Sequence, residues 1–119
     1  MTTQEIAKRL TELCRKGEWE TAQKELYADA AISIEPEASP VSEKETKGLP
    51  AIIEKGHKFQ SIVEQMRGLT ISEPLLATSS IAFTLNMDIT MKGGKRQNMG
   101  ELCVYKVKDG KIVSEEFFM

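Results

Sequence analysis

The sequence lacks long hydrophobic runs and clusters of basic residues. No apolar stretch approaches the roughly 18–20 residues that span a bilayer, and the N-terminal residues lack the apolar segment of a secretory signal. Lys and Arg total 16 against 18 Asp and Glu, a formal net charge of −2. Nucleic-acid affinity comes largely from neutralising phosphates, so this balance argues against a nucleic-acid partner. We therefore expect a cytoplasmic protein without a membrane or nucleic-acid partner.

Cysteine and histidine are also scarce. Cys14 and Cys103 lie in different segments and form no CxxC pair, which favours two reduced, buried thiols over a disulfide. His57 is the single histidine and has no Cys, His or acid at ligand spacing, so we predict no metal site. We interpret it as a helix-boundary residue, and a pocket acid/base role is the alternative. The serines lack an elbow motif, and nucleophilic catalysis has no support.

The chain of 119 residues suits one domain, residues 1–119. Thr2 and Glu5 have capping-box spacing, and Gly17 stands where a first helix would end. Helices segregated from a run of strands predict an α+β fold, with helices on one face of a curved, mostly antiparallel sheet. The predicted order is α-α-β-α-β-β-β-β: helices before and after Gly17, a strand over 30–35, a polar loop over 36–48, a helix over 49–67, and strands over 69–76, 79–91, 97–108 and 112–119.

The helix over 49–67 has an apolar stripe at helical spacing that includes Ile52, Gly56, Phe59, Val63 and Met66. Glycine costs about 1 kcal/mol relative to alanine inside a helix. We therefore expect Gly56 to permit close packing against a neighbouring element.

Three segments of the sequence carry a resemblance to a known family. Residues 26–36 (LYADAAISIEP) are similar to a helix-to-strand joint in that family. Gly48, which precedes an apolar-acidic helix, resembles the start of its third helix, and residues 104–118 (VYKVKDGKIVSEEFF) resemble its last hairpin. Together they resemble the SnoaL-like domains of the nuclear-transport-factor-2-like superfamily, which includes polyketide cyclases and ketosteroid isomerases. The resemblance implies a cone-shaped, mostly antiparallel sheet wrapped on three helices, with an apolar pocket at the open end.

The resemblance also suggests which acids to consider. Glu35 stands where ketosteroid isomerases place a carboxylate base, and an apolar pocket raises the pKa of a carboxyl group towards the range useful for proton transfer. The isomerases' oxyanion donors have no counterpart, because their positions fall on Leu10 and at or beside Cys103. Classical ketosteroid isomerase activity is therefore not expected. SnoaL-like cyclases use a pocket acid, and the acids on strands are Asp88, Glu101 and Glu115.

The last hairpin leaves two registers open. A three-residue loop with a bulge at Gly110 puts Val113, Glu115, Phe117 and Met119 on the face of Glu101, Cys103 and Tyr105. A two-residue turn at Asp109-Gly110 puts Glu116 and Phe118 there instead of Glu115 and Phe117. We favour the bulged loop, because it agrees with the inward residues of the resembled fold.

The strand over 79–91 has one apolar face, Phe83, Leu85, Met87 and Ile89, and one polar face. If the polar face lines the cone, the apolar face lies outside, and a homodimer through the outer sheet face would cover it.

We therefore expect a small-molecule-binding domain. If it is an enzyme, it is a cofactor-independent acid/base cyclase or isomerase acting on a hydrophobic substrate. The alternative is a non-enzymatic ligand-binding or dimerisation module with a filled cone, in which each acid faces solvent or a subunit interface. The candidate catalytic residues are Glu35, Glu101 and Asp88, and the candidate ligand-binding residues are Trp19, Phe59, Cys103, Tyr105, Glu115, Phe117 and Met119.

Overall fold

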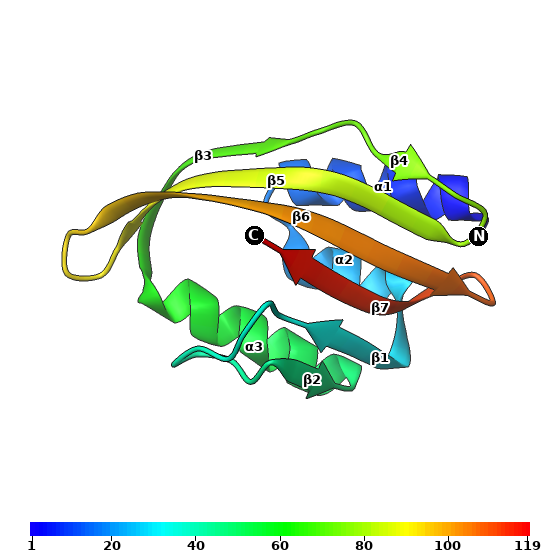
Figure 1. Cartoon of the computed structure of the whole chain (residues 1–119), viewed down its shortest axis with the longest axis horizontal. Coiled ribbons are helices and arrows are strands. Elements are labelled where there is room, and N and C mark those ends of the chain that lie inside the picture. The colour runs from blue at the N-terminus through cyan, green and yellow to red at the C-terminus, as the bar shows by residue number, and fades with distance from the viewer.

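The computed structural model describes all 119 residues, as three helices and one sheet of seven strands (Figure 1). Helices α1 and α2 lie behind the strands in this view, and α3 closes the lower side. The elements are α1 Thr3–Arg15, α2 Trp19–Leu26, β1 Tyr27–Ile34, β2 Glu45–Lys47, α3 Leu49–Ile62, β3 Val63–Ile71, β4 Leu75–Leu76, β5 Ser80–Met91, β6 Arg96–Lys108 and β7 Lys111–Phe118.

The strand order is β2-β1-β7-β6-β5-β3, and the short β4 pairs with β5 outside this path. Only β1 and β7 run parallel, and every other pair is antiparallel. The long strands curve around the helices, which confirms the predicted α+β class with a curved, mostly antiparallel sheet. No helix is long and apolar enough to cross a membrane.

The first helix forms as its sequence predicts. The Thr2 hydroxyl accepts from the Glu5 backbone N–H, and the Glu5 carboxylate accepts from the Thr2 N–H, so both halves of the capping box are present. Gly17 follows the helix with a φ of 72°, a conformation that favours glycine. Cys14 on the inner face is buried, and both it and the buried Cys103 are free thiols.

Four boundaries differ from the prediction. The strand expected over 30–35 spans Tyr27–Ile34, because pairing with β7 already begins at Tyr27. The loop over 36–48 contains the short strand β2, which pairs with β1. The helix expected over 49–67 ends at Ile62, because the chain from Val63 onward pairs with β5. The helical spacing of Val63 and Met66 does not prevent a strand, and the pairing with β5 decides the structure there. The strand expected over 69–76 is divided, with β3 ending at Ile71 and β4 covering only Leu75 and Leu76.

The apolar face of β5 points inward. Phe83, Leu85, Met87 and Ile89 are all buried, and Ala82, Thr84, Asn86 and Asp88 occupy the outer face. The premise that this apolar face lies outside and needs a partner is therefore wrong.

The β6–β7 hairpin combines features of both predicted registers. Lys108 pairs with Lys111, so the loop is the two-residue turn Asp109-Gly110, with φ of 52° and 75° as a type I′ turn requires. The expected three-residue loop is therefore wrong. However, the register shifts so that Val113 is left without a partner, and this bulge brings Glu115 opposite Tyr105. The favoured inward face is thus confirmed for Glu101, Cys103, Tyr105, Glu115, Phe117 and Met119. It is wrong at Val113, because the bulge makes Ile112 the buried residue there.

Candidate functional site

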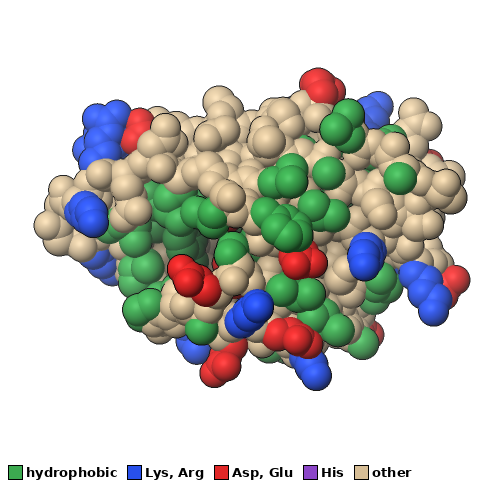
Figure 2. All heavy atoms as spheres, in the orientation of Figure 1, with side chains coloured by type: hydrophobic (Ala, Val, Ile, Leu, Met, Phe, Trp, Pro, Cys, Tyr) green, Lys and Arg blue, Asp and Glu red, His purple; other side chains and the backbone are tan.

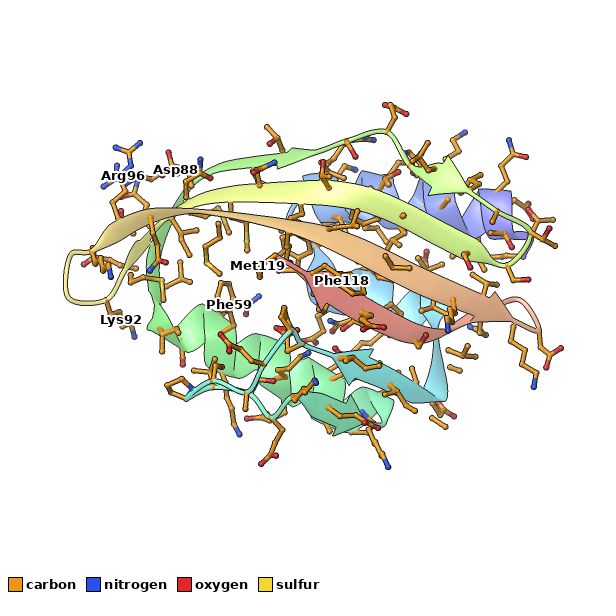
Figure 3. The ribbon with its side chains drawn as sticks, in the orientation of Figure 1. Phe59, Asp88, Lys92, Arg96, Phe118 and Met119 are labelled. Carbon is orange, nitrogen blue, oxygen red and sulfur yellow. The ribbon has the colours of Figure 1, made fainter.

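A cavity of about 540 Å³ lies between the inner face of the sheet, the helices and the loop after β1. In Figure 2, hydrophobic side chains gather around a hollow on the viewed face, and in Figure 3 Phe59 rises from α3 towards the underside of the sheet. Nine of the ten predicted site residues line this cavity: Trp19, Glu35, Phe59, Glu101, Cys103, Tyr105, Glu115, Phe117 and Met119.

Asp88 is the exception. It lies on the outer face of β5, where its carboxylate accepts two hydrogen bonds from the Arg96 guanidinium at 2.7 and 3.0 Å (Figure 3). These bonds lower the pKa of Asp88. Because side chains alternate along a strand, the inward Met87 and Ile89 fix Asp88 outward. The structure therefore separates Asp88 from the other candidate acids.

The helix α3 borders the cavity instead of packing closely. Ile52 is its single fully buried residue, and Gly56 and Phe59 line the cavity. A Cβ added at Gly56 would meet no atom within 4 Å, so the expected close packing at this glycine is wrong.

Glu115 is buried at the centre of a hydrogen-bond network. The Tyr27 hydroxyl donates to one carboxylate oxygen, and the Ser33 hydroxyl donates to the other at 2.6 Å. Burial raises the pKa of Glu115, and these two donors oppose that effect. Burial, together with the nearby Glu115 charge, also raises the pKa of Tyr27 well above its usual value.

Lys55 connects this network to Glu35. Its ammonium donates to the Ser33 hydroxyl at 2.5 Å and lies 3.4 Å from a carboxylate oxygen of Glu35. It also lies 5.6 Å from the centre of the Phe117 ring, within range of a cation–π interaction. The contacts form a continuous series from Tyr27 through Glu115, Ser33 and Lys55 to Glu35, in which every acid has a donor.

Glu101 is different, because no N–H or O–H group of the protein donates to its carboxyl. Its one hydrogen-bond contact is the Cys103 thiol, with Sγ 4.0 Å from Oε1, a weak donor at a long distance. Burial is the largest cause that raises the pKa of Glu101 to about 7, and the negative charges of Glu35 and Glu115 add to it, with Lys55 opposing. Glu101 is thus an unpaired acid on the cavity wall that can change protonation state near neutral pH.

The cavity thiols are not suited to nucleophilic chemistry at neutral pH. Burial raises the pKa of Cys14 to about 12, and it also raises the pKa of Cys103 far above its usual value.

His57 stands outside the cavity. It contacts the Glu20 carboxylate of α2, and its Nδ1 lies 3.7 Å from Glu54. This exposed contact joins α2 and α3 in the middle of α3 and not at a helix end. No group of three or more metal-ligating side chains comes together in the structure.

Sequence reasoning missed Tyr27, Ser33 and Lys55. Ser33 alternates with Ala31 on one face of β1, and Glu35 continues the alternation just after the strand, which was a usable signal of an inward position. Lys55 is spaced three residues after Ile52 and four before Phe59, so its place beside the apolar stripe was also visible. The contacts among the three residues join β1, α3 and β7, and no local pattern could have revealed them.

Comparisons with known proteins agree with this architecture. The family model of the SnoaL-like domain matches residues 1–119. A crystal structure from Mesorhizobium loti, named as a candidate SnoaL-like polyketide cyclase and carbohydrate phosphatase, is 32% identical over 100% of both chains, with a TM-score of 0.92. A nuclear-transport-factor-2-like protein from Burkholderia pseudomallei is 15% identical over 98% of this chain and 88% of its own, with a TM-score of 0.82.

A more distant likeness is to TerC, in a structure co-crystallised with polyporic acid. That protein is 15% identical over 97% of this chain and 88% of its own, with a TM-score of 0.78. This likeness and the Burkholderia one show the fold alone. No curated protein matches the chain.

Proposed function

The chain belongs to the SnoaL-like domain family, and on that premise we propose that it is an acid/base enzyme of the cyclase or isomerase type, acting on an apolar small molecule in the cavity. The observation that carries this proposal is Glu101, an acid without a donor partner and with a pKa of about 7 on the wall of an apolar cavity. General acid/base groups work best when their pKa lies near the working pH. The cyclase name of the M. loti relative supports the same class of reaction.

Glu101 and Lys55 have complementary roles in this proposal. The Glu101 carboxylate removes a proton from a carbon beside a substrate carbonyl and returns it at another position. The Lys55 ammonium, held by Ser33 and Glu35, stabilises the negative charge that develops on the substrate oxygen. Glu35 acts by holding Lys55, and Glu115 by holding Ser33. In this proposal the side chains of the protein supply both the base and the stabilising positive charge, and the reaction needs no cofactor.

The apolar lining supplies the binding energy. Trp19, Phe59, Tyr105 and Phe117 surround the cavity and can bury the faces of a hydrophobic molecule. A volume of about 540 Å³ lies within the range of small-molecule sites and supports a ligand cavity over a filled cone.

Proton exchange provides a test that does not require the product to be identified. A thermal-shift screen of apolar carbonyl compounds first identifies those that raise the melting temperature. In D₂O, the wild type should then catalyse exchange of the carbon-bound protons beside the carbonyl. Glu101→Gln should bind the same compounds and lose at least about a hundredfold in exchange rate, the usual contribution of a general base.

Glu64→Gln is the matched control, because it makes the same change at an exposed position on β3 outside the cavity. It should exchange protons like the wild type. Compounds that bind without exchange above the buffer rate would instead favour the non-enzymatic ligand-binding module.

We also propose a homodimer through the outer sheet face. The cross-strand neighbours Leu102 and Phe118 lie on that face and are 40% and 44% exposed. Around them the outer face carries the uncharged Ala82, Thr84 and Asn86 on β5, and Glu116 on β7 is the charged neighbour of Phe118. A two-fold contact pairs such a patch with itself. The two free thiols suit a reducing compartment, and we propose that the protein works in the cytoplasm.

A further inference from the structure

The charges on the cavity wall are mostly of one sign. Glu35, Glu37, Glu101 and Glu115 line the cavity, and Lys55 is its single basic residue. Lys55 is already engaged by Ser33 and Glu35. An anion that enters would therefore meet a net negative wall, and a cation would be attracted to it.

One of these acids is available to a ligand. Glu115 has the hydroxyls of Tyr27 and Ser33, and Glu35 has Lys55. Glu101 has only the distant Cys103 thiol. A half-buried carboxylate without a donor is costly, and a charged N–H donor from a ligand would relieve that cost through a strong, charge-assisted hydrogen bond.

The aromatic lining suits a cation as well as a hydrocarbon. Ammonium groups are attracted to the faces of aromatic rings, best of all to Trp. Trp19, Phe59 and Tyr105 line the cavity, and the Lys55 ammonium already lies over the ring of Phe117.

We infer that the cavity takes an apolar amine, bound as its ammonium, which donates to Glu101 while its hydrocarbon body lies against the aromatic and methionine side chains of the wall. This inference rests on the proposed function in one respect, that the cavity is the ligand site. It adds the chemical class of the ligand, and it gives Glu101 the role of ammonium partner, so that for such a ligand Glu101 is the binding group and not the base.

Three probes with one hydrocarbon frame test the charge preference: 2-naphthylmethylamine, 2-naphthalenemethanol and 2-naphthoic acid, measured by isothermal titration calorimetry at pH 8. The amine should bind at least about tenfold more tightly than the alcohol, the size of effect expected for a hydrogen bond between charged groups. The acid, ionised at this pH, should bind most weakly. This order is measured on the wild type and does not depend on any variant folding.

The pH dependence identifies Glu101 as the partner. The charged or titratable groups near Glu101 are Glu35 after β1, Lys55 on α3, Glu115 on β7 and Cys103 on its own strand, and its partner on β5, Leu85, is apolar. With a pKa of about 7 for Glu101, amine affinity should fall about tenfold between pH 8 and pH 6. Glu101→Gln should abolish the preference for the amine over the alcohol, and Glu64→Gln should keep it.

The possible failures are distinguishable. An alcohol or acid that binds as tightly as the amine would overturn this inference and leave the cavity as a ligand site. A preference for the amine that survives in Glu101→Gln would overturn the assignment of Glu101 as its partner. Absence of binding by all three probes would overturn this inference, and the thermal-shift screen of carbonyl compounds would separately decide whether the cavity binds a ligand.

Discussion

At the scale of single residues, Glu35, Glu101 and Glu115 share one cavity but not one environment. Glu115 and Glu35 each have a donor, and Glu101 has no nitrogen or oxygen donor. Acids in one site with such different surroundings commonly divide structural and proton-transfer roles. The sequence could name all three as candidates, but their partners come from distant elements, so it could not tell which acid is unpaired.

The stability of the protein should reveal the raised pKa of Glu101. Between the unfolded pKa near 4.5 and the folded pKa of about 7, the folded state keeps a proton that the unfolded state has released, so stability falls as pH rises. A glutamine in place of Glu101 does not titrate and removes this dependence. The stability of Glu101→Gln relative to wild type should therefore increase by up to about 3 kcal/mol from pH 4 to pH 8.

Urea denaturation at several pH values measures this difference, with Glu64→Gln as the control for loss of one negative charge. A stability difference between Glu101→Gln and wild type that does not change with pH would contradict the raised pKa.

Ser33 should stabilise the fold through the Glu115 network. Its hydroxyl accepts from Lys55 and donates to Glu115, so Ser33→Ala leaves a buried carboxylate with one donor fewer. We expect a loss of about 1–3 kcal/mol in the free energy of unfolding, measured by urea denaturation. Ser114→Ala makes the same change on β7, where no side-chain hydrogen bond forms, and should stay within about 0.5 kcal/mol of wild type. Equal effects of the two substitutions would argue against the network.

At the scale of elements, the position of α3 makes the cavity. Its inner face buries only Ile52 and leaves Gly56 and Phe59 against open space. The apolar stripe predicted this face correctly, because a helical period reports which side faces inward. It could not report whether another side chain or a cavity lies opposite, and it extended the helix past Ile62 into residues that pair with β5.

Substitutions at Gly56 test this arrangement. A Cβ there meets no atom within 4 Å, so Gly56→Ala should raise the free energy of unfolding by about 1 kcal/mol through helix propensity. Gly56→Leu places a larger side chain in the cavity and should abolish binding of compounds that stabilise the wild type, as measured by thermal shift. Destabilisation by Gly56→Ala, or unaffected binding in Gly56→Leu, would mean that α3 does not border an open cavity.

The last hairpin shows a second limit of sequence reasoning at this scale. The Asp109-Gly110 dipeptide is typical of a two-residue turn, and such a turn forms. The face of β7 is nevertheless decided by the bulge at Val113, which no turn signal encodes. The inward residues could therefore be predicted only from the resemblance to a family.

At the scale of the whole molecule, the cavity uses interior volume that would otherwise be core. The order of the elements and the family resemblance were sufficient to predict the fold class, because helices and strands are well separated along the chain. The sequence-based reason for a dimer is wrong, since the apolar face of β5 faces inward. The exposed side chains of Leu102 and Phe118 on the outer face are a different reason to propose a dimer.

The proposed dimer has a direct measurement. Light scattering during size-exclusion chromatography should give twice the mass of the chain for the wild type. Phe118→Lys should give a monomer, because a two-fold contact places that charge near its own copy. Lys58→Glu, an exposed change on α3 away from the sheet, should leave the dimer intact. A wild type that elutes as a monomer at micromolar concentrations would refute the proposed interface.

The most direct test of the central claim is the titration of the Glu101 carboxyl group itself. Carbon-13 NMR of the glutamate carboxyls, with the Glu101 resonance assigned by its disappearance in Glu101→Gln, follows that one group as the pH changes. The unpaired position in the cavity predicts a pKa of about 7. A value near the ordinary glutamate pKa of about 4.3 would contradict the claim that Glu101 is the proton-transfer group.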